Sequence, residues 1–113
     1  MGLFAFIAAA ADVTGKWTAD IPGRNGNTQN VTFDLKSDGS SVTGNMTTPR
    51  GEAPISDGKL DGNNISFNTV MKLQDNEVTM KYKGVVEGST IKFTRTVNFN
   101  GNERTSEFTA KKQ

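Results

Sequence analysis

The chain has 113 residues, enough for one domain with a modest core. Its 13 basic and 12 acidic side chains leave a net charge of +1, which argues against a nucleic-acid or anionic-membrane binder. The chain has no cysteine and no histidine, which excludes disulfides, thiol catalysis, histidine-dependent catalytic triads and most transition-metal sites. We therefore predict no cofactor and no metal site.

The first eleven residues differ in composition from the rest. Residues 2–11 are apolar, carry no charge and end in four alanines before Asp12. A hydrophobic stretch with an Ala-x-Ala end is typical of a secretory signal, although the basic start is missing. It is too short to span a membrane as a helix. We predict a secreted or periplasmic protein whose residues 1–11 are a signal remnant; if retained, they form an apolar arm that favours a homo-oligomer.

Residues 12–113 are predicted to form a single all-β domain. Apolar and polar residues alternate along most of it, as at Val31, Phe33 and Leu35, and short Gly, Asn and Asp turns separate the alternating runs. Residues 49–54 are the least regular connection and are predicted to be a loop at a barrel mouth. The predicted strands are 13–18, 28–36, 41–48, 54–60, 64–73, 77–87, 90–100 and 103–111.

An internal repeat supports a meander of hairpins. The stretch 57–67 resembles 83–93, with Gly58/Gly84, Gly62/Gly88, Ile65/Ile91 and Phe67/Phe93 each 26 positions apart. Short connections make consecutive strands pair antiparallel. Eight such strands predict an antiparallel up-and-down β-barrel, because closure leaves no exposed edge. An open sandwich of two four-stranded sheets is the alternative.

The segment Thr14-Gly-Lys-Trp17 resembles the first strand of the avidin and lipocalin superfamily of calycin barrels. The resemblance implies that Trp17 plugs one end of the barrel beneath a basic residue of the last strand, which Arg104, Lys111 or Lys112 could supply. The chain from Asp12 onward also resembles small secreted bacterial domains of unknown function. The tryptophan-rich walls of biotin-binding members are missing, since Trp17 is the only tryptophan.

The turns also predict a polar row inside the barrel. An Asn100-Gly101 turn places Arg95 opposite Ser106, and a turn after Glu87 places Tyr82 opposite Arg95. If Leu73 pairs with Val78, Thr69 lies opposite Tyr82. All four positions share the parity of the apolar residues, which predicts a buried row of Thr69, Tyr82, Arg95 and Ser106.

Arg95 is the most informative member of this row. A buried guanidinium needs partners for its donors, and the inward positions supply no carboxylate. A ligand bearing a carboxylate or phosphate, or ordered water, would complete the site. Alternatively, Arg95 reaches solvent near a barrel end, or pairs with a loop acid such as Glu52. Arg104 shares the inward parity but lies near a hairpin end, so we expect it to be solvated.

Three functions follow. The first is binding of a small, partly apolar, anionic molecule inside the barrel, at Thr69, Tyr82, Arg95 and Ser106. The second is a structural, self-assembling extracellular protein that uses the apolar arm. The third is a carbohydrate-related acid–base hydrolase, which would have to rely on loop acids such as Glu52, Asp57 or Asp75. The lack of inward carboxylates argues against an enzyme without excluding one.

Overall fold

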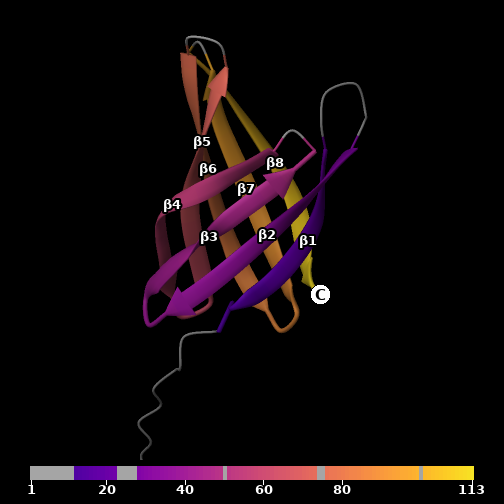
Figure 1. Cartoon of the computed structure of the whole chain (residues 1–113), viewed down its shortest axis with the longest axis vertical. Coiled ribbons are helices and arrows are strands. Elements are labelled where there is room, and N and C mark those ends of the chain that lie inside the picture. The colour runs from indigo at the N-terminus through magenta and orange to yellow at the C-terminus, as the bar shows by residue number, and fades with distance from the viewer. Residues whose placement is uncertain (1–11, 23–27, 50, 74–75, 100) are drawn as a thin grey trace, which may run out of the picture.

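A computed structural model of the chain describes residues 12–22, 28–49, 51–73, 76–99 and 101–113. These residues form eight strands and no helix, so none of them forms a helix able to cross a membrane (Figure 1). The predicted segment 1–11 lies outside the described residues. The strands are β1 (Gly15–Pro22), β2 (Thr28–Asp38), β3 (Ser41–Thr48), β4 (Gly51–Asp61), β5 (Asn64–Leu73), β6 (Asn76–Glu87), β7 (Thr90–Phe99) and β8 (Asn102–Lys112).

Each strand pairs antiparallel with the next, and β8 pairs with β1, so the sheet closes into an up-and-down barrel. The predicted fold class is confirmed, and the open sandwich is excluded. The repeat appears as two similar hairpin turns, in which Gly62 and Gly88 have φ angles of 62° and 64°. Residues with a Cβ rarely adopt this left-handed conformation, which explains glycine at both turns.

The predicted pairings around Arg95 are confirmed. Tyr82 pairs with Arg95 across β6 and β7, and Arg95 pairs with Ser106 across β7 and β8. The predicted pairing of Thr69 with Tyr82 is wrong. Leu73 pairs with Asn76 instead of Val78, so Thr69 lies opposite Met80 and Phe67 lies opposite Tyr82. A register shift of two residues keeps every side chain on its predicted face, and alternation alone therefore cannot detect it.

The predicted loop at residues 49–54 is also wrong, because most of it belongs to β4. Thr48 pairs with Gly51, and Pro54 lies within the strand opposite Asn45. The irregularity lies further along β4, where the register with both neighbouring strands shifts by one residue. At this bulge Asp57 has a φ of 52°, and a Cβ on Gly58 would lie 2.0 Å from the Val42 carbonyl oxygen. The bulge bends the strand, which helps a small sheet close.

The two ends of the barrel differ. We name the end that holds Trp17 and the turns at 39–40, 62–63 and 88–89 the closed end, and the opposite end the far end. The side chains that alternate into the barrel form its core, including five aromatic rings besides Trp17. These rings belong to Phe33, Phe67, Tyr82, Phe93 and Phe108.

The seam between β1 and β8 is shorter than the other strand interfaces. Only three pairs join the two strands among the described residues, from Trp17↔Lys112 to Ala19↔Ala110, whereas ten pairs join β7 to β8. Toward the far end, β8 continues beside β7 while β1 rises with β2 on the other side (Figure 1). The barrel is therefore closed near Trp17 and parted along this seam toward the far end.

Candidate functional site

The structure brings together the four residues predicted from sequence, in two adjacent rows instead of one. Phe67, Tyr82, Arg95 and Ser106 form one cross-strand row on β5 to β8. Thr69 belongs to the next row toward the far end, together with Met80, Val97 and Arg104. Because adjacent rows on one face are in reach of each other, Thr69 remains a diagonal neighbour of Tyr82.

Two polar atoms of this cluster are enclosed without a hydrogen-bond partner. They are the Thr69 hydroxyl oxygen and the Arg95 Nε. Thr69 is 1% exposed, whereas Arg95 is half-buried, so its Nε is enclosed while the residue keeps some contact with solvent. Glu52 is exposed, and Arg95 forms no ion pair within the described residues. The predicted alternative in which Glu52 neutralises Arg95 is therefore not what the structure shows.

Tyr82 lies near both Thr69 and Arg95, and the hydrogen bonds of its own hydroxyl are weak. Its hydroxyl reaches the sulfur of Met46 at 3.3 Å and that of Met80 at 3.9 Å, and thioethers are weak acceptors. Burial raises the pKa of Tyr82, while the nearby Thr69 hydroxyl and the Arg95 charge oppose that rise. Neither Thr69 Oγ1 nor Arg95 Nε forms a hydrogen bond to the Tyr82 phenol. Their effect on the pKa of Tyr82 therefore comes from proximity.

The aromatic rings form a floor beneath the polar cluster. Tyr82 stacks on Phe67 with 4.9 Å between ring centroids, and Phe33 contacts four of the other rings at 5.5 to 6.2 Å. Offset and edge-to-face contacts of this kind add stability beyond the buried area. The interior between this floor and the closed end is filled by side chains. A ligand in contact with Arg95 must therefore lie on the far-end side, where Ile55 and Val97 are only partly buried.

Trp17 occupies the closed end, as the resemblance implied. It is 1% exposed, and its indole N–H donates to the Val13 carbonyl at 2.9 Å. Of the three basic residues considered, Lys112 is the one over the indole, with its Nζ 5.8 Å from the ring centroid. A Cβ on Gly15 would lie 3.1 Å from the Lys112 side chain, so glycine leaves room for this cation–π contact.

The acidic residues considered for hydrolysis do not join this site. Glu52 and Asp57 are exposed on β4, and Asp75 lies outside the described residues. No aspartate or glutamate is among the buried residues of the described ranges. In the same ranges, no three His, Cys, Asp or Glu side chains are grouped as metal ligands would be.

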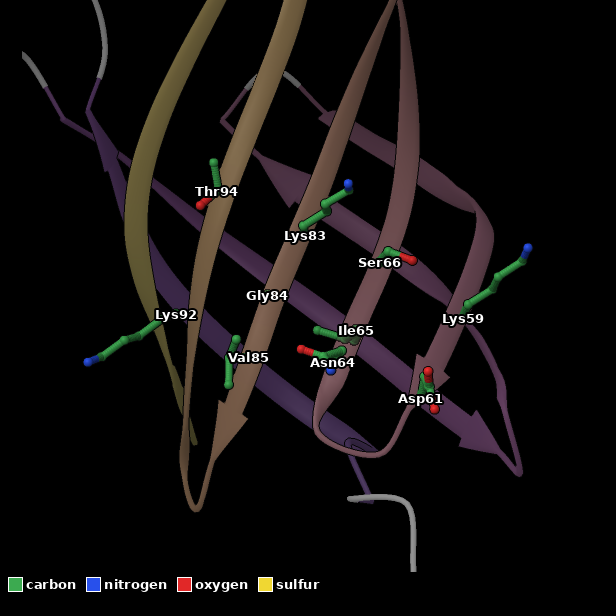
Figure 2. A pocket seen from close by; sticks show the side chains of 10 residues that line it. All are labelled: Lys59, Asp61, Asn64, Ile65, Ser66, Lys83, Gly84, Val85, Lys92 and Thr94. Carbon is green, nitrogen blue, oxygen red and sulfur yellow. The ribbon is translucent and has the colours of Figure 1, made fainter.

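A groove of about 450 Å³ on the outer wall was not predicted from the sequence. It crosses β4 to β7, and three lysines, Lys59, Lys83 and Lys92, stand around a floor that includes Val85 (Figure 2). The cross-strand row Lys59–Ser66–Lys83 could have indicated it. Figure 2 shows Lys59 and Lys92 at opposite margins, pointing away from each other. Because these ammonium groups do not converge, the groove is a weaker candidate than the interior cluster.

No protein-family model matches this chain, and no curated protein matches it. Its function must therefore be argued from the geometry of the site.

Proposed function

We propose that this protein is an exported β-barrel that binds a small amphiphilic anion in the far-end half of the barrel. The observation that carries the proposal is the pair of enclosed atoms without partners, the Arg95 Nε and the Thr69 hydroxyl. An enclosed donor or acceptor without a partner costs about 1–3 kcal/mol. A site that retains two of them is suited to a ligand that satisfies both.

The chemistry of the lining argues for an anion with an apolar part. Arg95 can offer a carboxylate several donors, and no buried carboxylate in the described ranges competes for it. Thr69, Tyr82 and Ser106 add hydroxyl groups in the same row as Arg95 and in the adjacent row. Ile55 and Val97 offer apolar contact toward the far end. The ring floor limits the depth of the site, so a small ligand fits this arrangement better than a large one.

The resemblance to calycin barrels supports the same function. The closed eight-stranded meander and the Trp17–Lys112 contact agree with what the resemblance implied, and proteins of this architecture hold small ligands in the barrel. Export would fit a protein that captures such molecules outside the cytoplasm, as the apolar residues before Asp12 suggest.

A negative charge on the ligand should strengthen its binding to Arg95. We expect the wild type to bind decanoate more tightly than 1-decanol, which has the same chain length without the charge. Arg95→Leu should weaken decanoate binding about 30-fold, corresponding to about 2 kcal/mol, because a charge-assisted hydrogen bond is lost. Titration calorimetry with both compounds measures this difference.

Lys81→Leu is the control, because it removes a positive charge from an exposed position on the outer face of β6. It should change decanoate affinity by less than about threefold, as expected for a solvated charge. Equal losses of decanoate affinity in the two variants would mean that the overall positive charge of the protein, and not Arg95 itself, attracts the anion. Binding that is indifferent to both variants would place the site elsewhere.

A further inference from the structure

The β8 strand has a free edge toward the far end. Pairing with β1 ends at Ala19↔Ala110, whereas pairing with β7 continues to Phe99↔Asn102. Residues 102–108 therefore have a strand on one side only, within the part of the chain that the structure describes. We call this segment the free β8 edge. Barrels normally avoid such an edge, because its backbone groups can pair with another strand.

Hydrogen bonds near the C-terminus show which backbone groups face the open side. Lys112 donates its N–H to Ser89 beside β7, and Gln113 donates its N–H to Lys16 of β1. Backbone groups alternate in direction along a strand, so odd-numbered residues of β8 point toward the β1 side. The N–H and C=O groups of Glu103, Thr105 and Glu107 consequently face the open side with no described ladder partner.

The sequence of β1 explains why this strand does not cover the edge. Lys16 accepts a hydrogen bond from Gln113, so the even-numbered residues of β1 face β8. The backbone of Pro22 also faces β8, but proline has no N–H. It therefore cannot donate a hydrogen bond to a neighbouring strand at the end of β1. The edge of β1 is thus blocked by proline, whereas that of β8 retains three donors and three acceptors.

Charge along the free β8 edge differs between its two faces. Glu103 and Glu107 point to the outer surface and are exposed. On the barrel side, Ser106 is flanked by Arg104 on its own strand and by Arg95 opposite it on β7. An incoming strand therefore meets negative charge outside and positive charge inside. Two copies paired antiparallel about Thr105 would place Glu103 opposite Glu107, which disfavours that self-pairing.

We propose that the free β8 edge binds an extended peptide segment by strand addition, and that the segment carries acidic side chains toward the barrel and basic side chains outward. Main-chain hydrogen bonds to Glu103, Thr105 and Glu107 provide affinity, and the alternating charges provide selectivity. The principal contacts are backbone groups of β8, and the inward acidic side chains of the peptide also approach Arg95, which the proposed small-molecule site uses as well.

Amide hydrogen exchange measured by NMR tests the proposal on the full chain. The peptide used is the end-blocked octamer Lys-Glu-Lys-Glu-Lys-Glu-Lys-Glu, which separates the two charges onto the two faces of a strand. It should slow exchange at Glu103, Thr105 and Glu107 at least tenfold. Arg104 and Ser106 serve as internal references, because their N–H groups already face β7. The octamer Lys-Lys-Glu-Glu-Lys-Lys-Glu-Glu has the same composition with mixed faces and should protect these amides much less.

Two variants locate the contact. Thr105→Pro removes one donor on the open side without removing a hydrogen bond to β7, and it should abolish the protection while circular dichroism confirms the fold. Glu103→Lys with Glu107→Lys should weaken binding at least tenfold. Asp34→Lys with Asp38→Lys makes the same charge change on exposed positions of β2 and should not.

Three results would overturn the proposal. The first is no protection by the alternating octamer. The second is equal protection by both octamers, which would remove the charge selectivity. The third is protection that rises with protein concentration in the absence of peptide, which would assign the edge to a second copy of the chain.

Discussion

Thr69 places a hydroxyl inside the barrel where no described group bonds to it. Its direct cross-strand neighbours are Ile55 and Met80, both apolar. A buried hydroxyl without a partner destabilises the folded protein relative to an apolar group of the same shape. Functional sites commonly contain residues that lower the stability of the folded protein. We therefore expect the Thr69 hydroxyl to contribute to ligand binding.

Substitution by valine separates these two effects. Thr69→Val should increase the free energy of unfolding by about 1 kcal/mol, since it removes the unpaired hydroxyl and keeps the branched shape. The same variant should bind decanoate more weakly, because one hydrogen-bonding group of the site is lost. Urea denaturation and calorimetry measure the two quantities. Thr105→Val, at an exposed position of β8, should change neither appreciably; a less stable Thr69→Val would show that the hydroxyl is bonded after all.

At the level of elements, the start of the domain is tied to the end of β2 by hydrogen bonds. The Asp12 carboxylate accepts from the Thr14 N–H at 3.0 Å and from the Ser37 hydroxyl at 2.9 Å. Ser37 in turn accepts from the Val13 N–H, and Val13 accepts from the Trp17 indole. Chiefly because of the Thr14 backbone N–H, the pKa of Asp12 is lowered from its ordinary 3.8. This short chain of contacts positions the Trp17 plug.

The lowered pKa gives a prediction for the pH dependence of stability. A carboxylate with a lowered pKa in the folded state stabilises the protein above its ordinary pKa, and this contribution is lost as the pH falls through the folded-state value. Asp12→Asn should therefore lower the melting temperature at pH 7 and have little effect below pH ~2. Thermal melts of both proteins across this range measure the difference. An equal difference at both extremes would show that the charge of Asp12 is irrelevant.

Within the strands, the direction of the side chains follows from the sequence, whereas the register between strands does not. Alternation places Tyr82, Arg95 and Ser106 inside correctly, because one face of every strand must be buried. Alternation cannot distinguish two registers that differ by an even number of residues, because both place the same side chains inside. For this reason the prediction missed that Thr69 lies in the adjacent row. The proline at position 54 suggests a loop, yet it is tolerated beside the bulge of β4. The parted seam between β1 and β8 depends on sheet curvature, which local patterns do not specify.

At the level of the whole molecule, the Trp17 plug and the two proposed binding sites lie toward opposite ends of the barrel. Val13, Trp17 and Lys112 fill the closed end, and β1 enters there from Asp12. The proposed ligand site and the free β8 edge lie on the far-end side of the aromatic floor. Residues 2–11 therefore join the barrel at the end remote from both, and their removal should disturb neither.

Deletion of residues 2–11 tests this separation and the self-assembly alternative together. The shortened chain should retain the melting temperature and the decanoate affinity of the full chain, because the hydrogen bonds of Asp12, Val13 and Trp17 are all kept. If the apolar arm drives association, light scattering should show an oligomer for the full chain and a monomer for the shortened one, since an exposed apolar segment gains by being covered. Identical masses would eliminate the arm as an assembly element. A loss of decanoate binding would instead show that residues 2–11 affect the ligand site. It would contradict a site confined to the far-end side of the aromatic floor.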